Sequence, residues 1–474
     1  MKINVNASIS DHQMILVPVY KHQVLKKDEL DLNGELEFLF DLKIFDGSKG
    51  SFHFLRKNKN ILFFGLGDES AVTPSITREM IGGAVREAKK LKAKSLVFYC
   101  REPKYLGALV ETVILADYDF EVYKTADREQ KIETLNLVLK EDFDEAVIRE
   151  YQALAQGTMI ARDLANEPAN ILNPAELARR TRDLGETFGF EVEVYGREAI
   201  EKERMAAYLA VASASENEPQ LIVMRYKGAP ATKKTYGLVG KGLTYDSGGL
   251  SIKPTDGMVT MKGDMSGSAA VIGTFTALSA NGVKANVTGV IAACENMISG
   301  KGFRPGDILR ARNGKTIFVG NTDAEGRLTL ADALDYIIEK EKVDEVVDIA
   351  TLTGAAVRAL GHTTTAILGN SAEKIGAFFK ASEPADERLW ELPLFDDYKD
   401  QLKHHEADLN NLGGDPGTIT AAAFLENFVG ETPWVHLDIA GTAFSEKARG
   451  YRPKGATGMG VRLLYHYIKG DESN

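Results

Sequence analysis

The feature that most constrains the fold is a repeated alternation of short apolar runs and helical patterns after residue 190. Helical patterns separate six such runs, namely FEVEVY, QLIVMRY, TYGLVG, VTGVIAAC, EVVDIATL and TTAILGN. This alternation is typical of a parallel or mixed sheet that carries helices on both faces. Ligands of such sheets bind beyond the carboxyl ends of the strands. The pattern therefore predicts an α/β fold and a site at that edge.

The first 140 residues predict a smaller α/β unit. Strand-like alternation or short apolar runs occur in INVNASI, MILVPVY, ELEFLF, SFHFLR, NILFFGLG and SLVFYC. Helical spacing covers residues 75–92 and 106–115. The FGLG at the end of the fifth run lacks the third glycine of a dinucleotide-binding loop, so a strand-to-loop turn is the favoured interpretation.

A long helix is predicted to lead out of this unit, because apolar residues recur at helical spacing from Phe143 to Ile160. Two prolines in NEPANILNPAEL end it before a helix at 175–188. A chain of 474 residues is too long for one ordinary core. We expect a smaller N-terminal α/β domain at 1–150 and a larger C-terminal domain at 151–474, with a central mixed sheet flanked by helices.

Composition indicates a soluble globular protein, with 44% hydrophobic and 26% charged residues. The net charge of -11 argues against general affinity for nucleic acid or anionic membrane. The two cysteines, Cys100 and Cys294, each end an apolar run and are expected to be buried reduced thiols in a cytoplasmic protein. The N-terminus does not resemble a secretory signal, and no apolar run is long enough to span a membrane.

Charged residues gather in three glycine-rich segments, VGKGLTYDSGGLSIKP, MVTMKGDMSG and VGNTDAEGRL. They supply Lys241, Asp246, Lys253, Asp264, Asp323, Glu325 and Arg327. Each residue taken singly is typical of a solvated loop. Together, four carboxylates converging in a partly buried pocket would repel one another unless cations neutralised them. Four such charges offset two divalent ions, and carboxylate oxygens suit zinc, manganese or magnesium.

Individual members of this set suggest different roles. Asp323 and Glu325 lie two residues apart on an expected strand-like extension, so their side chains should share one face. Lys241 could coordinate an ion as a neutral amine, although a salt bridge to an aspartate is the interpretation that the residues alone favour. Lys253 and Arg327 could stabilise an oxyanion or hold an auxiliary anion. A water activated by two metals would attack an amide, an ester or a phosphate.

Other catalytic schemes fit the sequence poorly. Ser247, Ser266 and Ser268 lie near glycines, but none occupies a G-x-S-x-G elbow. The histidines form no H-E-x-x-H pattern, and the adjacent His404 and His405 are expected at the surface. The chain contains no P-loop.

The three segments resemble those of the leucyl aminopeptidase (cytosol aminopeptidase) family of dinuclear metallo-exopeptidases. The likeness covers residues 155–465 and includes ARDLANEPANILNPAELA, ENMISGKGFRPGDI, DIATLTGA, ADLNNLGG, ITAAAFLENFV, HLDIAGTA and ATGMGVRLL. It implies a cytoplasmic homohexamer that removes N-terminal residues, with leucine-type preference, from peptides with a free N-terminus through a metal-bridged hydroxide. An α/β N-terminal domain is also implied, although the first 140 residues match no family motif.

The resemblance also implies a ligand set for two divalent ions, zinc or manganese. Asp246 and Glu325 would bridge the ions. Lys241 and Asp264 would complete the more exchangeable site, and Asp323 would complete the other. Lys241 would therefore be a ligand, against the salt bridge that the residues alone favour.

Further roles follow from the same resemblance. Lys253 would polarise the scissile carbonyl, and Arg327 would hold a bicarbonate-like anion that acts as general base. Met261 and Thr351 match positions near the side-chain pocket, and Leu352 lies by the anion site.

Two residues beside Asp264, Gly263 and Ser266, depart from the common family pattern. Neither is a ligand, so they put the shape of the pocket in doubt and not the metals. Two other functions are weighed against an aminopeptidase. Some bacterial family members bind DNA, which the acidic charge disfavours here. A dinuclear phosphoesterase would be expected to use histidine-rich ligation, which these segments lack.

Overall fold

The computed structural model describes residues 1–474 except 11, 27–29, 101–104, 140–142 and 471–474. The chain forms two compact units. The first comprises Met1–Ala155 and Glu446–Lys454, and the second comprises Gln156–Ser445 and Gly455–Asn474. The sequence did not predict the return of residues 446–454 to the first unit. None of the helices in the described part of the chain is long and apolar enough to cross a membrane.

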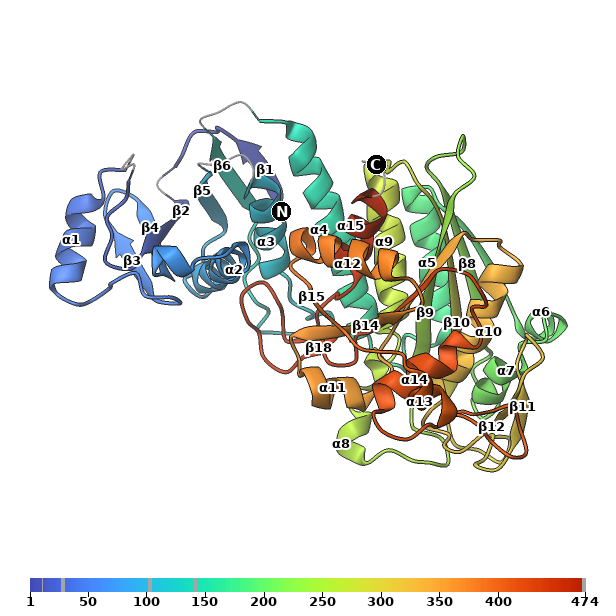
Figure 1. Cartoon of the computed structure of the whole chain (residues 1–474). Helices are drawn as coiled ribbons and strands as arrows, with labels where there is room; N and C mark the ends of the chain where they lie inside the picture. The colour runs from blue at the N-terminus through green and yellow to red at the C-terminus, as the bar shows by residue number, and fades with distance from the viewer. Residues whose placement is uncertain (11, 27–29, 101–104, 140–142, 471–474) are drawn as a thin grey trace. The chain divides into compact units, whose positions relative to one another are not determined.

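A six-stranded sheet forms the centre of the first unit (Figure 1). Its order is β1-β6-β5-β2-β4-β3, and every neighbouring pair is parallel except the antiparallel β3 and β4. The strands are β1 (Lys2–Val5), β2 (Met14–Tyr20), β3 (Phe52–Arg56), β4 (Asn60–Gly67), β5 (Ser95–Cys100) and β6 (Thr134–Leu139). The FGLG forms the last four residues of β4, so these residues belong to the strand and the loop begins only after them.

The predicted helices of this unit are confirmed as α2 (Pro74–Lys90) and α3 (Leu106–Ala116). The long connecting helix is α4 (Glu145–Asn166). Thr73 starts α2 because its side chain accepts a hydrogen bond from the Ile76 amide and Pro74 occupies the first turn.

The strand predicted from ELEFLF is wrong, because this segment lies in helix α1 (Asn33–Asp41). Leu36 and Leu39, three residues apart, are buried, whereas Phe38 is 62% exposed. The short apolar run fits both the helical and the strand periodicity, and it contains no β-branched residue that would favour a strand. Helical spacing therefore buries one face of the segment.

The second unit is built on an eight-stranded mixed sheet of order β15-β14-β17-β13-β9-β10-β8-β7. Its four central strands, β17, β13, β9 and β10, are mutually parallel, while β14, β8 and β7 introduce antiparallel pairs. The strands are β7 (Glu191–Tyr195), β8 (Gln220–Lys227), β9 (Thr235–Asp246), β10 (Asn286–Asn296), β13 (Glu345–Ala350), β14 (Thr364–Gly369), β15 (Arg388–Glu391) and β17 (Trp434–Asp438). This confirms the predicted α/β fold with a central mixed sheet.

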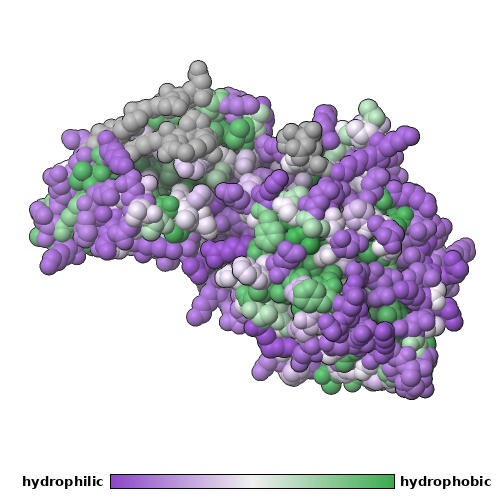
Figure 2. Space-filling model, viewed as in Figure 1, coloured by the Kyte–Doolittle hydropathy of each residue, from purple (hydrophilic) through white to green (hydrophobic). Residues whose placement is uncertain are grey.

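Helices cover both faces of this sheet (Figure 1). One layer contains α5 (Pro174–Phe188), α9 (Ser266–Asn281) and α15 (Val461–Gly470). The other contains α7 (Ala206–Ala212), α10 (Gly326–Glu339) and α14 (Gly417–Glu426). Charged and polar residues colour most of the visible face of the unit, with a smaller apolar area (Figure 2). Cys294 is buried in this sheet and Cys100 in the other, and no disulfide joins them, as predicted.

Helix α9 approaches the sheet closely at its amino-terminal end. A Cβ added to Gly267 would lie 2.0 Å from the carbonyl oxygen of Ile349 in β13, so only glycine fits there. The residues of α9 from Ser266 to Leu278 are all buried. This close packing places the start of α9 beside the carboxyl ends of β9 and β13.

A small sheet has the order β11-β12-β16, and it joins two strands that lie between β10 and α10 in the chain to one that comes well after α10. It consists of β11 (Ile308–Arg310), β12 (Thr316–Phe318) and β16 (Leu409–Asn410). Because β12 and β16 are parallel neighbours, the loops that follow them lie together. The ring of His404 stacks on Phe318 at 3.9 Å, so only His405 is as exposed as predicted.

Candidate metal centre

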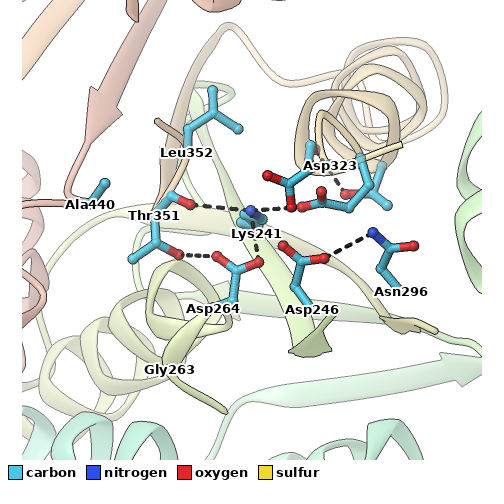
Figure 3. Close-up of polar contacts among 12 residues, drawn as sticks. Lys241, Asp246, Gly263, Asp264, Asn296, Asp323, Thr351, Leu352 and Ala440 are labelled. Carbon is cyan, nitrogen blue, oxygen red and sulfur yellow. Dashed lines mark hydrogen bonds and ion pairs between the residues drawn. The ribbon is translucent and has the colours of Figure 1, made fainter. Parts of the chain in front are cut away.

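The carboxyl ends of the four central strands meet at one edge of the large sheet, as parallel pairing requires. Strand β9 delivers Lys241 in its interior and Asp246 at its end. Thr351 directly follows β13, and Asp438 ends β17. The predicted cluster of charged residues assembles at this edge (Figure 3).

Lys241 occupies the middle of the cluster. Its Nζ lies 2.8 Å from Asp264 Oδ2 and 3.0 Å from Glu325 Oε1, and it donates a hydrogen bond to the Thr351 carbonyl at 3.1 Å. Only 3% of Lys241 is exposed. The ion pair expected from the residues alone is therefore part of this arrangement, and the same amine faces two candidate metal ligands.

Lys253 approaches the cluster from the more open side. Its Nζ lies 2.8 Å from Asp246 Oδ2 and 2.5 Å from Asp323 Oδ1. The Lys253 side chain is 18% exposed and that of Asp323 33%. Each of the two lysines therefore pairs with two of the four carboxylates.

Three carboxylates are close enough to hold one ion. An oxygen of Asp246, one of Asp323 and one of Glu325 all lie within 4.8 Å of one another. Asp264 faces Lys241 beside them. Glu325 Oε2 is buried and receives no hydrogen bond from the residues that the structure describes. An all-oxygen donor set with a buried unpaired oxygen suits a divalent cation.

The electrostatics also favour a cation. Burial, reinforced by the charge of Asp246, raises the pKa of Glu325 above its ordinary value. Burial likewise raises the pKa of Asp264, although the charge of Lys241 opposes the shift. The two lysines therefore do not fully compensate the buried carboxylates, and a divalent ion would stabilise their charged forms.

The backbone around Asp246 explains the glycines of the first segment. Asp246 Oδ1 accepts hydrogen bonds from the Gly248 amide and from Asn296 Nδ2, each at 2.8 Å. Gly248 and Gly249 have positive φ angles of 85° and 66°. A Cβ on Gly248 would lie 2.8 Å from Asp323 Oδ1, so a larger residue would enter the cluster.

The strand-like extension predicted for Asp323 and Glu325 is wrong. Asp323 lies in a turn, and Glu325 immediately precedes helix α10. Asn321 Oδ1 accepts a hydrogen bond from the Asp323 amide at 2.7 Å, which is a side-chain-stabilised turn that competes with extended backbone. The two carboxylates converge because the turn bends toward the pocket, not because they share a strand face.

The other predicted residues border the cluster. Thr351 Oγ1 donates to Asp264 Oδ1 at 2.8 Å, and the Leu352 amide donates to Asp438 Oδ1 at 3.2 Å. Met261 begins a short 3-10 helix, Met261–Gly263, that ends beside Asp264. A Cβ on Gly263 would meet the Phe444 ring at 3.6 Å, an ordinary contact, so alanine would also fit at this position.

Arg327 lies in the first turn of α10 and is buried. Its Nη1 donates to the Asn411 carbonyl at 2.9 Å, and its Nε has no hydrogen-bond partner among the described residues. Burial lowers the pKa of Arg327 to about 10, so the guanidinium remains charged at neutral pH.

Two buried asparagines at the site were missed by the sequence reasoning. Asn296 binds Asp246, and Asn411 binds the turn that carries Asp323. Each lies in a segment of the family resemblance, ENMISG or ADLNNLGG, but nothing in the residues themselves indicated a role.

Comparison with known proteins identifies the family. Residues 159–465 match the catalytic domain of the cytosol aminopeptidase family, and residues 16–127 match the N-terminal domain of the same family. A probable cytosol aminopeptidase of Clostridium perfringens is 44% identical over 470 residues, covering 95% of each chain. One from Fusobacterium nucleatum is 46% identical over 430 residues, covering 90% of this chain and 89% of the relative.

Solved structures agree with this match. A mutant of tomato leucine aminopeptidase superposes with a TM-score of 0.89 at 32% identity, covering 99% of this chain and 96% of that one. The bottromycin maturation enzyme BotP in complex with Mn superposes with a TM-score of 0.87 at 30% identity, covering 97% and 99%. The chain therefore belongs to the cytosol aminopeptidase family and is a metal-dependent aminopeptidase, a hydrolase that acts on peptides.

Proposed function

We propose that this aminopeptidase holds two divalent ions, zinc or manganese, through Lys241, Asp246, Asp264, Asp323 and Glu325. The observation that carries the proposal is the convergence of three carboxylate oxygens within 4.8 Å, with Lys241 and Asp264 directly beside them. The Mn complex of the similar BotP supports divalent binding by this fold. When bound, the ions would lower the pKa of a coordinated water and polarise the scissile carbonyl.

The chain's own residues would do the remaining work. The Lys253 ammonium, which reaches the open side of the cluster, would donate a hydrogen bond to the carbonyl oxygen as negative charge develops there. The Arg327 guanidinium would hold a bicarbonate-like anion near the reacting water, and that anion would accept its proton. No group among the described residues accepts a hydrogen bond from the buried Nε of Arg327, which supports this role because a donor is left for an anion.

Substrate choice would depend on the residues that border the ligands. Met261, Thr351 and Leu352 are all partly exposed at this edge and would contact the side chain of the N-terminal residue. Two of the three are apolar, which supports a preference for leucine-type side chains. The substrate would be a peptide with a free N-terminus.

The protein would act in the cytoplasm as a homohexamer, with no nucleic acid or membrane partner. The net charge of -11 supports the absence of a nucleic acid partner. Exposed apolar side chains near the site, at Leu250, Ile252 and Val259, support contact between subunits. The number six comes from the family resemblance.

The test is the removal of single ligands. Asp323→Ala and Glu325→Ala should each abolish turnover of leucine p-nitroanilide and reduce the metal content measured by mass spectrometry of the purified protein. Circular dichroism should show that the fold persists. Either variant with full activity and full metal content would refute the proposed ligand set.

A further inference from the structure

We propose that Asn411 is a positioning residue that holds the turn Gly320–Glu325 in place and thereby sets the affinity for the metal ions. The inference rests on the proposed function, since this turn carries the candidate ligands Asp323 and Glu325. In the part of the chain that the structure describes, Asn411 makes no hydrogen bond to either of these carboxylates. Its effect would be transmitted through the backbone of the turn.

The side chain of Asn411 binds both halves of the turn. Its Oδ1 accepts hydrogen bonds from the amides of Gly320 at 2.8 Å and Asn321 at 3.2 Å. Its Nδ2 donates to the carbonyls of Asn321 at 2.7 Å and Ala324 at 3.3 Å. A primary amide has two acceptor positions and two donors, so the hydrogen-bonding capacity of the side chain is fully used. Asn411 is 0% exposed, so water does not compete for these groups.

The main chain of Asn411 also binds the elements on either side of the turn. Its amide donates to the Phe318 carbonyl at the end of β12, at 2.9 Å. Its carbonyl accepts from Arg327 Nη1 in the first turn of α10, at 2.9 Å. One residue therefore links the strand before the turn, the turn itself and the helix after it. The parallel pairing of β16 with β12 fixes its position.

The turn depends on such contacts because Val319 to Glu325 belong to neither a strand nor a helix. Burying amides and carbonyls without hydrogen-bond partners costs free energy, so the turn would rearrange if its hydrogen bonds to Asn411 were lost. Thr322 secures the opposite side, where its Oγ1 donates to the Gly248 carbonyl at 2.7 Å. We therefore expect weakened metal binding rather than complete loss when Asn411 is replaced.

The principal variant is Asn411→Ala, measured by Mn²⁺ titration of metal-depleted full-length protein against a chromophoric chelator. The expected result is metal binding weaker by about 10–100-fold, the range for residues that orient metal ligands. The matched control is Asn286→Ala. Asn286 clamps the loop after β8 in the same way, through Ala229 N at 3.1 Å, Ala229 O at 2.9 Å and Lys234 O at 3.3 Å.

Asn286 begins β10, at the opposite end of that strand from the site. Its replacement should lower the melting temperature but leave Mn²⁺ affinity as in the wild type. Equal losses of affinity in both variants would mean that general destabilisation is responsible, and the proposal would be overturned.

A second variant, Asn411→Asp, keeps the size of the side chain and its two acceptor bonds but loses the two donor bonds to Asn321 and Ala324. Its added negative charge favours cation binding, so weaker Mn²⁺ binding in this variant would have to arise from the geometry of the turn. Weaker binding supports the proposal, and unchanged or tighter binding overturns it.

The same titration on Asp323→Ala separates this inference from the proposed function. If Asp323→Ala loses Mn²⁺ affinity while both Asn411 variants retain it, only the positioning role fails. If Asp323→Ala also binds Mn²⁺ as the wild type does, the proposed ligand set fails, and with it the basis of the inference.

Discussion

Lys241 Nζ lies 2.8 Å from Asp264 Oδ2, with only 4% of either side chain exposed. This pair joins the interior of β9 to the turn that precedes α9. Burial opposes the charge on Lys241, but the carboxylates of Asp264 and Glu325 outweigh that effect and raise its pKa. The lysine therefore compensates the acids when no other cation is near.

Replacing Lys241 should show how far the buried carboxylates of Asp264 and Glu325 depend on its positive charge. Lys241→Met keeps the length of the side chain but leaves Asp264 and Glu325 without their buried partner. Breaking a buried ion pair from one side costs about 3–5 kcal/mol. We expect a fall of that order in the free energy of unfolding, measured by urea denaturation at pH 8 with chelator present. Unchanged stability would show that the acids do not rely on Lys241.

Replacing Lys253 should lower the catalytic rate more than the affinity for substrate. Lys253→Ala removes the ammonium that faces the open side of the cluster, and loss of one oxyanion donor lowers kcat by about 10²–10³-fold. We expect that loss with little change in KM and with metal content retained, measured with leucine p-nitroanilide. Lys253→Arg, which keeps the charge but changes its geometry, should recover only part of the rate. A main effect on KM would assign Lys253 to ground-state binding instead.

Much of the fold and site could be predicted because the signals were local. Lys241 and Asp246 lie in or at the end of an apolar strand, and parallel strands end at a common edge. Asn411 could not be predicted, because it contacts Gly320 from 91 residues away through the pairing of two very short strands. The turn at Asp323 was wrongly predicted as extended backbone. The side chain of Asn321 accepts a hydrogen bond from the Asp323 amide, and α10 begins directly after Glu325, so the segment forms a turn instead.

Stability should also depend on pH through His436, a buried histidine of β17. His436 Nδ1 lies 2.6 Å from Asp348 Oδ1, and neither side chain is exposed. Burial lowers the pKa of His436, but the Asp348 charge outweighs it and raises the pKa above 6.5. A histidine whose folded pKa is raised stabilises the protein fully below its unfolded pKa, and this contribution is lost as pH rises through the folded pKa.

His436→Asn keeps a group that can donate to Asp348 but cannot be charged. The difference in unfolding free energy between wild type and this variant should be largest near pH 6 and should shrink toward pH 9. Urea denaturation across that range in metal-free buffer measures it. A difference that grows with pH would mean that His436 is neutral in the folded protein.

The last prediction concerns the glycine at the start of α10. A Cβ on Gly326 would lie 2.5 Å from Lys241 Cε and 2.7 Å from its Nζ, so Gly326→Ala should push the amine away from Asp264 and Glu325. Alanine is a better helix former than glycine, so α10 itself should not suffer. We expect Mn²⁺ affinity to fall by about tenfold or more while the far-ultraviolet circular dichroism is unchanged.

The matched control for this change is Gly376→Ala in α12 (Ala372–Ala385), where an added Cβ meets nothing within 4 Å. That variant gains the same helix propensity with no contact to Lys241, so it should bind Mn²⁺ as the wild type does. Because the two substitutions are chemically identical, a loss of affinity confined to position 326 can be ascribed to the displaced amine. Wild-type affinity in Gly326→Ala would instead show that metal binding tolerates movement of Lys241, which would argue against its role as a ligand.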